Sequence, residues 1–419
     1  MNGAFANDVT IGTNIVARAI TIISSVNAPR PDLSRVPDRR SLILDARTWA
    51  EVSLTALRDN FQVVQKHVGK GVTICAVVKA DGYGHGAIEC ARALESAGAP
   101  WLGVTNAAEG LALRSAGVNA RVLLMTGIWK GEGESIVAQN LTPTIWEPWH
   151  IDSLERAARQ RHCVLPVHLK IDTGMNRLGV SLDALPRLCE MLSACKHLSL
   201  EGVSTHFASA EVLDAEDACR QVKRFEDGLA ILQSYGLRPA LIHMGNSAAM
   251  TARPDTWKTM VRPGIALYGY SLAFTRGGEP AAVTPLPLRP VLSWKTRVLT
   301  VKEVGAGEAV GYMGTFVTME RSRIAVLPVG YADGYPRLLS NRARVIVGGE
   351  YAPVVGRVSM DLTIIDVSHI RDVAVGDEVI LIGALSGKSV DAVELARLCE
   401  SVPYEILCGL SQRVPRVYL

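Results

Sequence analysis

The sequence is short of net charge, of paired cysteines and of long hydrophobic runs. Its 419 residues contain 44 Lys and Arg against 41 Asp and Glu, which gives a formal net charge of +3. Proteins that bind nucleic acid by electrostatics carry a basic surplus or a basic cluster, and no run of five or more basic residues occurs here. We therefore expect no nucleic-acid partner.

The eight cysteines are scattered and include no C-x-x-C pair. Zinc sites and small disulfide frameworks depend on close cysteine spacing, so this pattern indicates neither. It is typical of buried thiols in a reducing cytosol. We predict a cytoplasmic protein that binds no metal.

The apolar segment that most resembles a membrane span or a signal peptide, residues 15–26, is interrupted by Arg18. A membrane-spanning helix needs about 20 apolar residues, so this segment is too short. As a secretory signal it lacks a basic start and a clear cleavage site, since Asp8 is the only charge before Arg18. We expect no membrane span and no secretion.

Residues 1–44 lack sustained periodicity and end in a segment rich in proline and mixed charge, which predicts a loosely ordered extension. From residue 73 onward, short runs rich in Val, Ile and Leu alternate with longer amphipathic stretches. Eight such runs occur, at residues 73–80, 100–106, 121–127, 141–146, 165–174, 198–208, 239–246 and 260–268. The helix-like stretches between them include residues 86–98, 148–161, 182–197 and 215–236.

This alternation predicts an α/β fold with a (β/α)8 barrel, or TIM barrel, at residues 45–285. A doubly wound open sheet is the alternative, because periodicity does not show whether a sheet closes. We interpret residues 286–419 as a separate C-terminal all-β domain, with which the strand-like run at residues 50–54 is placed to pair. Its expected strands are residues 291–301, 322–329, 343–347, 363–367 and 378–382, with one helix at residues 390–399.

Barrel enzymes have their catalytic residues at the C-terminal ends of the strands and in the loops that follow. The first barrel strand ends at Lys79. A lysine held partly out of water has a lowered pKa and becomes a usable nucleophile or base, although this position also suits a lysine that merely reaches solvent. The glycines that follow miss the G-x-G-x-x-G spacing of a dinucleotide site. Ser247, Gly264 and Ile265 fit a phosphate site formed by the last two strand loops.

The segment Ala76-Val-Val-Lys79-Ala-Asp-Gly-Tyr83-Gly-His-Gly resembles the pyridoxal phosphate attachment signature of alanine racemases. In that family the lysine carries the cofactor as a Schiff base, and the tyrosine four residues later touches its phosphate. The resemblance extends from about Trp49 to Leu419. By this resemblance the chain is identified as a member of the alanine racemase family.

The same resemblance assigns further barrel residues. It implies that Arg177 binds the substrate carboxylate, for which its planar fork is suited, and that Lys170 occupies a position that is often carbamylated and orients this arginine. It places His206 against the cofactor ring, Asn246 beside the cofactor, and Arg262 against the pyridine nitrogen. A cation there leaves that nitrogen unprotonated, which favours return of a proton to Cα. Taken alone, Arg177 would be a solvated charge and His206 a core residue.

In the C-terminal domain, the resemblance implies that Tyr312 is a second acid/base residue. It also implies that the backbone of Met360 meets the substrate carboxylate beside Asp361, and that Tyr331 lies near the entrance. In the family, Tyr312 and Met360 reach the cofactor of the neighbouring subunit. This implies a head-to-tail homodimer with two shared sites.

We therefore predict a racemase that interconverts L- and D-alanine and supplies D-alanine for peptidoglycan. Inversion requires bases on opposite faces of a planar carbanion, and the resemblance gives Lys79 the D face and Tyr312 the L face. Gln412 stands where many racemases have a tyrosine that closes the alanine pocket, so a serine or broad-specificity racemase is an alternative. Gly311 replaces a usual serine. A barrel-type amino-acid decarboxylase and a non-catalytic cofactor-binding barrel are disfavoured, because Lys79 and Tyr312 occur together.

Overall fold

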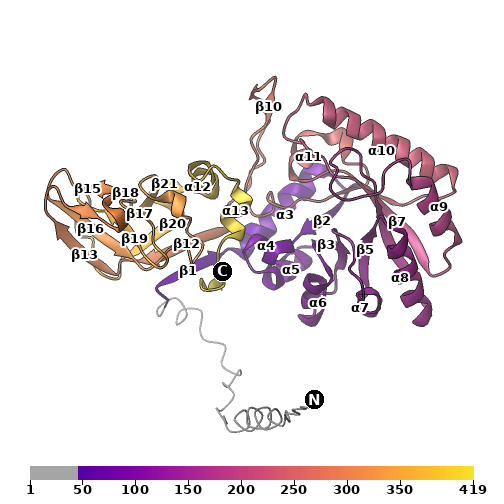
Figure 1. Cartoon of the computed structure of the whole chain (residues 1–419), viewed down its shortest axis with the longest axis horizontal. Coiled ribbons are helices and arrows are strands. Elements are labelled where there is room, and N and C mark those ends of the chain that lie inside the picture. Colours follow the sequence, from indigo (N-terminus) through magenta and orange to yellow (C-terminus); the bar gives the residue numbers. More distant parts are fainter. Residues whose placement is uncertain (1–45) are drawn as a thin grey trace, which may run out of the picture. The chain divides into compact units, whose positions relative to one another are not determined.

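Eight parallel strands form a barrel in the computed structural model, which describes residues 46–419 (Figure 1). The extension predicted for residues 1–44 lies outside the described residues. The strands are β2 (Thr73–Val77), β3 (Trp101–Val104), β4 (Arg121–Leu124), β5 (Leu141–Ile145), β6 (Leu165–Lys170), β7 (Leu198–Ser204), β8 (Leu241–His243) and β9 (Met260–Val261).

The barrel closes between β8 and β9, the two ends of the strand order β8-β7-β6-β5-β4-β3-β2-β9. There the amide of Thr259 donates to the carbonyl of Ile242 at 3.1 Å, and the amide of Arg262 donates to the carbonyl of Gly245 at 2.8 Å. All eight predicted strand runs form strands of this sheet. The barrel prediction is confirmed, and the open-sheet alternative is wrong.

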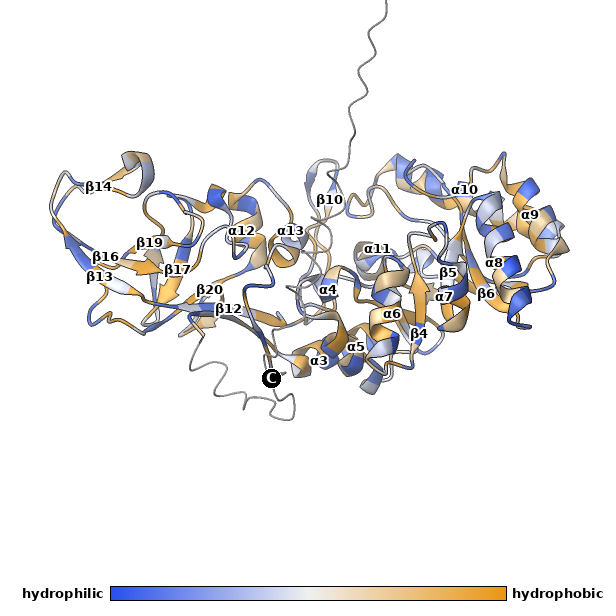
Figure 2. Ribbon diagram, turned by 60° about the horizontal axis from the view of Figure 1, so that its bottom comes forward, coloured by the Kyte–Doolittle hydropathy of each residue, from blue (hydrophilic) through white to orange (hydrophobic). Residues whose placement is uncertain are grey.

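Helices cover the barrel, and each connects two of its strands or precedes the first one. They are α3 (Leu54–Val68), α5 (Ala87–Ser96), α6 (Ala107–Ser115), α7 (Gly133–Ala138), α8 (Pro148–Gln160), α9 (Leu185–Ala194), α10 (Glu216–Ser234) and α11 (Ser247–Ala252). In α8, Pro148 begins the helix and the buried residues Ile151, Leu154 and Ala158 recur three and four positions apart. Figure 2 shows the resulting mixture of hydrophobic and hydrophilic residues along these helices.

The C-terminal part is rich in β structure, as predicted, and consists of several small sheets. A seven-stranded sheet has the order β18-β17-β20-β12-β1-β22, with β21 paired to β20, and a three-stranded sheet has the order β13-β16-β19. The strands are β1 (Thr48–Val52), β12 (Leu292–Arg297), β13 (Thr300–Val304), β16 (Ser322–Leu327), β17 (Arg344–Val347), β18 (Glu350–Pro353), β19 (Thr363–Asp366), β20 (Glu378–Leu385), β21 (Lys388–Val390) and β22 (Arg416–Tyr418). A short two-stranded piece in this part is β14 (Ala309–Val310) with β15 (Phe316–Val317), and another, β10 (Thr275–Arg276) with β11 (Glu279–Pro280), precedes residue 286.

Two expectations for this part need correction. The single strand expected at residues 291–301 is two strands, β12 and β13, because the chain leaves one sheet at Val298 and enters the other. The helix expected at residues 390–399 is present as α12 (Ala392–Leu398), but a second helix, α13 (Pro403–Cys408), follows it. Its six residues are too few to show a helical period in the sequence.

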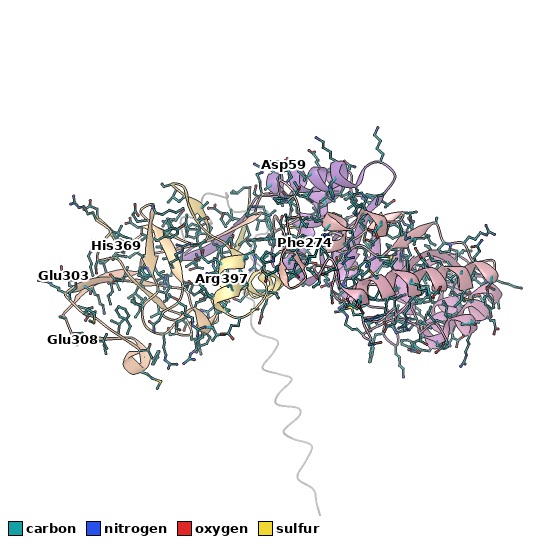
Figure 3. All side chains as sticks on the ribbon, turned by 90° about the horizontal axis from the view of Figure 1, so that it is seen from above. Asp59, Phe274, Glu303, Glu308, His369 and Arg397 are labelled. Atoms are coloured by element: carbon teal, nitrogen blue, oxygen red, sulfur yellow. The ribbon has the colours of Figure 1, made fainter. Side chains whose placement is uncertain are left out.

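The first strand, β1, precedes the barrel but belongs to the C-terminal sheet. It runs antiparallel to β12, with Thr48 opposite Thr296, and parallel to β22, with Ala50 opposite Arg416. This confirms the pairing expected for that run. The side chain of Asp59 on α3, labelled in Figure 3, also forms an ion pair with Arg289 just before β12. None of the helices within residues 46–419 is long and apolar enough to cross a membrane.

Candidate active site

A cavity of about 590 Å³ lies at the carboxyl ends of the barrel strands. Its wall contains every barrel residue that the sequence assigned to the site: Lys79, Tyr83, Lys170, Arg177, His206, Asn246, Ser247, Arg262, Gly264 and Ile265. These residues come from loops and strand ends that are up to 186 positions apart in the chain, from 79 to 265. The barrel therefore gathers them in one place, as its architecture predicts.

Lys79 opens an unusual turn, labelled α4 (Lys79–Tyr83), directly after β2. Ala80, Asp81 and Tyr83 have φ angles of 52°, 52° and 55°, in the left-handed region. Each such residue other than glycine costs roughly 1 kcal/mol, and backbone strain of this kind collects at functional sites. The turn is held by Glu109, whose Oε1 accepts a hydrogen bond from the Ala80 amide at 2.9 Å.

Glu109 supports the Lys79 turn without lining the cavity, and no motif in the sequence pointed to it. Its second oxygen, Oε2, accepts from the amide of Thr105 at 2.6 Å, so one carboxylate joins the ends of β2 and β3. Its own amide donates to Asn106 Oδ1 at 3.0 Å, and Asn106 caps α6. The sequence has the spacing of an ordinary capping box at Asn106 and Glu109, which indicates a helix start. That local role explains Glu109 fully, so the sequence does not indicate its contact with the Lys79 turn.

The environment of Lys79 favours its uncharged form. Burial lowers the pKa of the Lys79 amine, and the positive charges of Arg177 and Arg262 lower it further, while Glu109 acts in the opposite direction. A larger fraction of neutral amine at neutral pH means a better nucleophile and base. This agrees with the role expected of a lysine at the end of a barrel strand.

Tyr83, Ser247 and Gly264 line one side of the cavity and pack closely together. The Ser247 hydroxyl accepts from the amide of Gly264 at 2.9 Å. A Cβ atom added at Gly264 would lie 2.1 Å from the Tyr83 hydroxyl oxygen, so only glycine allows the tyrosine to approach. Beside them, Asn246 caps α11 by accepting from the Ala249 amide at 2.9 Å. The two hydroxyls and the neighbouring backbone suit a phosphate group.

Arg262 is a buried cation, 8% exposed, that is surrounded by neutral acceptors. It donates to the carbonyls of Thr205 and His243 at 2.8 and 2.9 Å, to His243 Nδ1 at 2.7 Å and to His206 Nδ1 at 3.3 Å. Within the described residues no carboxylate is bonded to it. Burial lowers the pKa of the Arg262 guanidinium to about 10, which still leaves it charged at neutral pH.

His206 is uncharged in this setting. Burial lowers the pKa of its imidazole to about 2, with further contributions from Arg262 and Lys170. Because arginine only donates, the Nδ1 atom of His206 that faces Arg262 must be the acceptor, and the ring proton lies on Nε2. His206 therefore offers the cavity a neutral ring.

Arg177 and Lys170 lie in the same wall and differ in what they contact. Arg177 forms no hydrogen bond or ion pair with any described residue, so its donors are available to a ligand. Lys170 ends β6, where burial, followed by Arg262 and Arg177, lowers the pKa of its amine to about 8. A neutral amine is accessible there near physiological pH.

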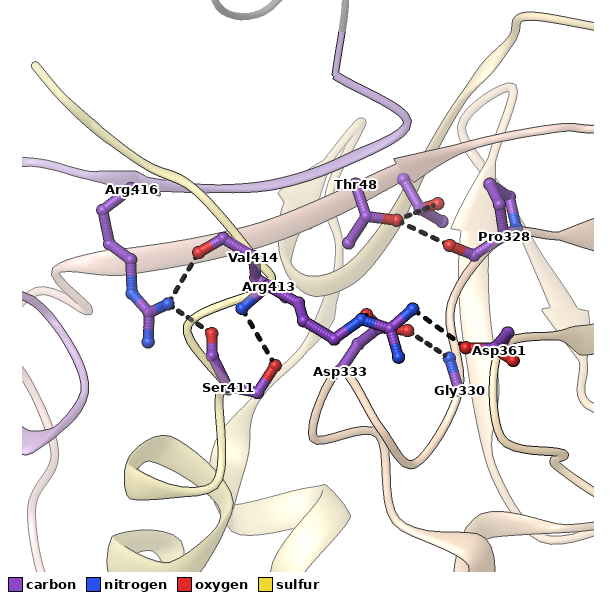
Figure 4. A network of polar contacts seen from close by, with 10 residues as sticks. Thr48, Pro328, Gly330, Asp333, Asp361, Ser411, Arg413, Val414 and Arg416 are labelled. Carbon is purple, nitrogen blue, oxygen red and sulfur yellow. Dashed lines mark hydrogen bonds and ion pairs between the residues drawn. The ribbon is translucent and has the colours of Figure 1, made fainter. Parts of the chain in front are cut away.

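The four predicted residues of the C-terminal part lie outside this cavity wall. Tyr312 is 71% exposed, and Tyr331 and Met360 are exposed as well. The loops of Tyr331 and Met360 are joined through the Ala332 amide, which donates to the Met360 carbonyl at 3.0 Å. Asp361 forms an ion pair with Arg413 at 2.8 Å, which Figure 4 shows.

Two departures from the family pattern can be placed in the structure. Gly311, just before Tyr312, has a φ of 74°, which glycine adopts more readily than serine. Gln412 is exposed and is not in the cavity wall of its own chain. Tyr404 on α13 does line the cavity, with its ring 5.9 Å from that of Tyr83, and the sequence analysis gave it no role.

Comparisons with known proteins agree with this geometry. Sequence profiles described as the alanine racemase N-terminal and C-terminal domains match residues 52–272 and 291–418. A curated alanine racemase of Symbiobacterium thermophilum is 43% identical over 371 residues, which cover 88% of this chain and 97% of that protein. Another, from Geobacter sulfurreducens, is 42% identical, and the match covers 90% of this chain and 98% of that protein.

Solved structures give the same result. An alanine racemase of Clostridium difficile has a TM-score of 0.83 at 33% identity, and the match covers 90% of this chain and 96% of that one. An alanine racemase of Bartonella henselae with covalently bound pyridoxal phosphate has a TM-score of 0.79 at 29% identity, covering 89% and 100%. The chain belongs to the alanine racemase family.

Proposed function

We propose that this chain interconverts L- and D-alanine with pyridoxal phosphate held in the barrel cavity. The observation that carries the proposal is one cavity that combines a partly desolvated lysine, Lys79, with a buried cation, Arg262, bonded only to neutral groups. A cavity of this kind suits an anionic, ring-shaped ligand with an aldehyde.

The residues present fit this cofactor. Lys79 would hold its aldehyde carbon, and the cradle of Tyr83, Ser247 and Gly264, with Ile265 beside it, would hold the phosphate. Arg262 would face the pyridine nitrogen, with His206 and Asn246 beside the ring. When bound, the cofactor supplies an electron-accepting ring that stabilises negative charge at Cα of the amino acid. Because Arg262 only donates, it opposes a proton on the pyridine nitrogen and so favours return of the proton to Cα.

Arg177 is the proposed anchor for the substrate carboxylate. Its planar guanidinium matches a carboxylate in two parallel hydrogen bonds, and no described residue occupies it. We propose that the Lys170 amine, whose lowered pKa leaves a neutral fraction, combines with carbon dioxide to give a carbamate and a proton. The resulting anion would attract and orient Arg177.

Two residues exchange the Cα proton in this proposal. Lys79 works on the D face, and Tyr312 of the partner subunit works on the L face. Support for the partner comes from position: Tyr312 is 71% exposed on its own chain and lies outside that chain's cavity wall. Met360, Asp361 and Tyr331 would accompany it near the substrate carboxylate and the entrance. The active unit is therefore a homodimer with two shared sites.

The cellular role we propose is supply of D-alanine for peptidoglycan in the cytoplasm. A broader substrate range is a second candidate, supported by Gln412 in place of a pocket-closing tyrosine. Relative rates on alanine, serine and lysine distinguish the two. A serine rate that equals or exceeds the alanine rate would favour the broader racemase.

A chiral assay on L-alanine tests the function. Full-length protein supplied with pyridoxal phosphate should bring L-alanine to an equal mixture of both enantiomers, and protein stripped of cofactor should not. Formation of ethylamine and carbon dioxide instead would favour a decarboxylase. Absence of any reaction in protein that binds the cofactor would favour the non-catalytic alternative.

A further inference from the structure

A line of polar side chains runs through the barrel interior from Arg262 to the other end of the strands. Arg262 Nη1 is 2.7 Å from His243 Nδ1, and His243 Nε2 is 2.9 Å from His168 Nδ1. His168 Nε2 faces Glu201 Oε2 at 3.8 Å, and Arg121 Nη2 donates to the same oxygen at 2.6 Å. We refer to Arg262, His243, His168, Glu201 and Arg121 as the interior relay.

The chemistry of the two ends fixes where the ring protons lie. Arg262 has no acceptor atoms, so His243 Nδ1 accepts and its proton is on Nε2. That proton is donated to His168 Nδ1, which leaves the His168 proton on Nε2, facing Glu201. Both rings are buried, and burial lowers the pKa of each, so both are neutral.

Glu201 is a fixed anion at the far end. Burial opposes its ionisation, but His168 and Arg121 outweigh burial and lower the pKa of its carboxyl to about 2. Both terminal nitrogens of Arg121 contact the two carboxylate oxygens. The relay thus has an obligate donor, Arg262, at one end and an acceptor, Glu201, at the other.

Packing holds the middle of the relay in place. A Cβ atom at position 202 would lie 2.6 Å from the His168 ring, so Gly202 makes room for this imidazole between the strands. The Trp101 ring lies 5.3 Å from His168, and the Arg121 guanidinium lies 4.0 Å above Trp101. The His168 Nε2 atom has no hydrogen-bond partner among residues 46–419, and the Glu201 carboxylate is the group it faces.

We propose that Glu201 and His168 are positioning residues that act through His243 to hold Arg262 in its orientation toward the cofactor site. This inference rests on the proposed function for its consequence, since Arg262 is there the residue against the pyridine nitrogen. The arrangement of ring protons itself does not depend on that function. Without the acceptor at His168, the His243 ring can turn or move its proton to Nδ1, where it would oppose the N–H of Arg262.

Substitution of His168 offers a matched pair. Asn places its side-chain oxygen near the position of Nδ1 and keeps an acceptor for His243, whereas Leu has a similar size and keeps none. H168L should weaken pyridoxal phosphate binding to cofactor-free protein about tenfold, the value of one lost hydrogen bond, and H168N should restore it to within about threefold. Equal affinities in H168L and H168N would overturn the proposal.

Glu201 has its own pair. E201L removes the carboxylate that His168 Nε2 faces at 3.8 Å and should weaken cofactor binding severalfold, while E201Q keeps an oxygen there and should have a smaller effect. E226L serves as the control, because Glu226 forms an ion pair with Lys258 at the surface at 3.2 Å and has no contact with the relay. An E201L variant that binds the cofactor as tightly as E226L would also overturn the proposal.

Nitrogen NMR of full-length protein labelled at histidine gives a readout that does not need activity. His168 and His243, assigned from the signals lost in H168N and H243N, should both carry their proton on Nε2 and remain neutral between about pH 6 and 8. In E201L, His168 should populate the Nδ1 form. Wild-type signals that show Nδ1–H, or rings that titrate in this range, would overturn the relay even if the racemase assignment holds. Unlabelled protein that binds no cofactor would instead overturn the proposed function and leave the NMR result to decide the relay.

Discussion

The barrel and the C-terminal part contribute predicted site residues in opposite ways. The ten barrel residues converge on one cavity, where burial and neighbouring charges change their chemistry. Tyr312, Met360 and Tyr331 are exposed on the C-terminal part and lie outside that cavity wall. In the proposed reaction a second copy of the chain must bring Tyr312 to the cavity, whereas the barrel residues line one cavity within a single chain.

Substitution of Lys79 should have the largest effect. Lys79→Ala removes both the proposed cofactor attachment and one base, so racemisation should fall by at least about 10⁴-fold. The visible absorbance of the bound cofactor should be lost with it. Chiral chromatography and absorbance spectra measure the two effects. A variant that keeps its colour and its activity would break the assignment of the barrel cavity.

Tyr312→Phe tests whether the C-terminal part contributes a residue to the reaction. Loss of one acid/base residue should reduce racemisation about 10²- to 10⁴-fold while cofactor binding persists, because Tyr312 lies outside the cavity wall. Exchange of the Cα proton of L-alanine with deuterated solvent should stop. Full activity in this variant would remove Tyr312 from the mechanism.

Mixing these two inactive variants tests whether each site is built from two chains. If sites are shared, a heterodimer of Lys79→Ala and Tyr312→Phe chains has one site with both defects and one with neither. With random exchange, half of the dimers are mixed, so activity should return to roughly a quarter of the wild-type value. Refolding the variants separately provides the control. No recovery in a mixture shown to contain heterodimers would mean that each site is built from one chain.

Gly264→Ala should weaken cofactor binding without affecting the proposed dimer. Because the added Cβ would overlap the Tyr83 hydroxyl, the tyrosine must move out of the phosphate cradle, and affinity should fall about 10- to 100-fold. Titration of cofactor-free protein measures this loss. Gly305→Ala is the matched control in the C-terminal part, where an added Cβ meets nothing closer than 3.7 Å. Equal affinities in the two variants would show that the cradle is not the phosphate site.

Much of the barrel could be predicted from sequence because its strands are buried on both faces and its helices on one. The strand ends then indicated Lys79 and the Ser247 and Gly264 loops. Arg177 and His206 needed the family resemblance, because an arginine in a loop and a histidine on a strand are common without any function. Tyr312 needed it even more, since nothing in its local sequence distinguishes an exposed aromatic from a site residue.

The residues that were missed act through contacts between distant segments. Tyr404 enters the cavity on a helix of six residues, and His168 and Glu201 face each other across two strands. Glu109 was concealed by the ordinary spacing of a helix cap. In each case the local pattern was already explained by local structure, so the second contact left no further signal in the sequence.

Glu109→Gln should have the smallest effect of these substitutions, and it separates two roles of one carboxylate. Loss of the charge removes the group that favours the protonated form, so the pKa of the Lys79 amine should move further down. The neutral amine is the form that reacts with an aldehyde, so the acid limit of cofactor attachment should shift to lower pH. The weaker hold on the Ala80 amide should meanwhile reduce cofactor affinity about three- to tenfold. Stopped-flow absorbance across pH measures the first effect, and equilibrium titration measures the second.

Glu89→Gln is the control, because Glu89 pairs with Arg92 on the outer face of α5. A shift of the acid limit to higher pH would show that Glu109 does not act on Lys79 through its charge, and the left-handed turn would then be its only target.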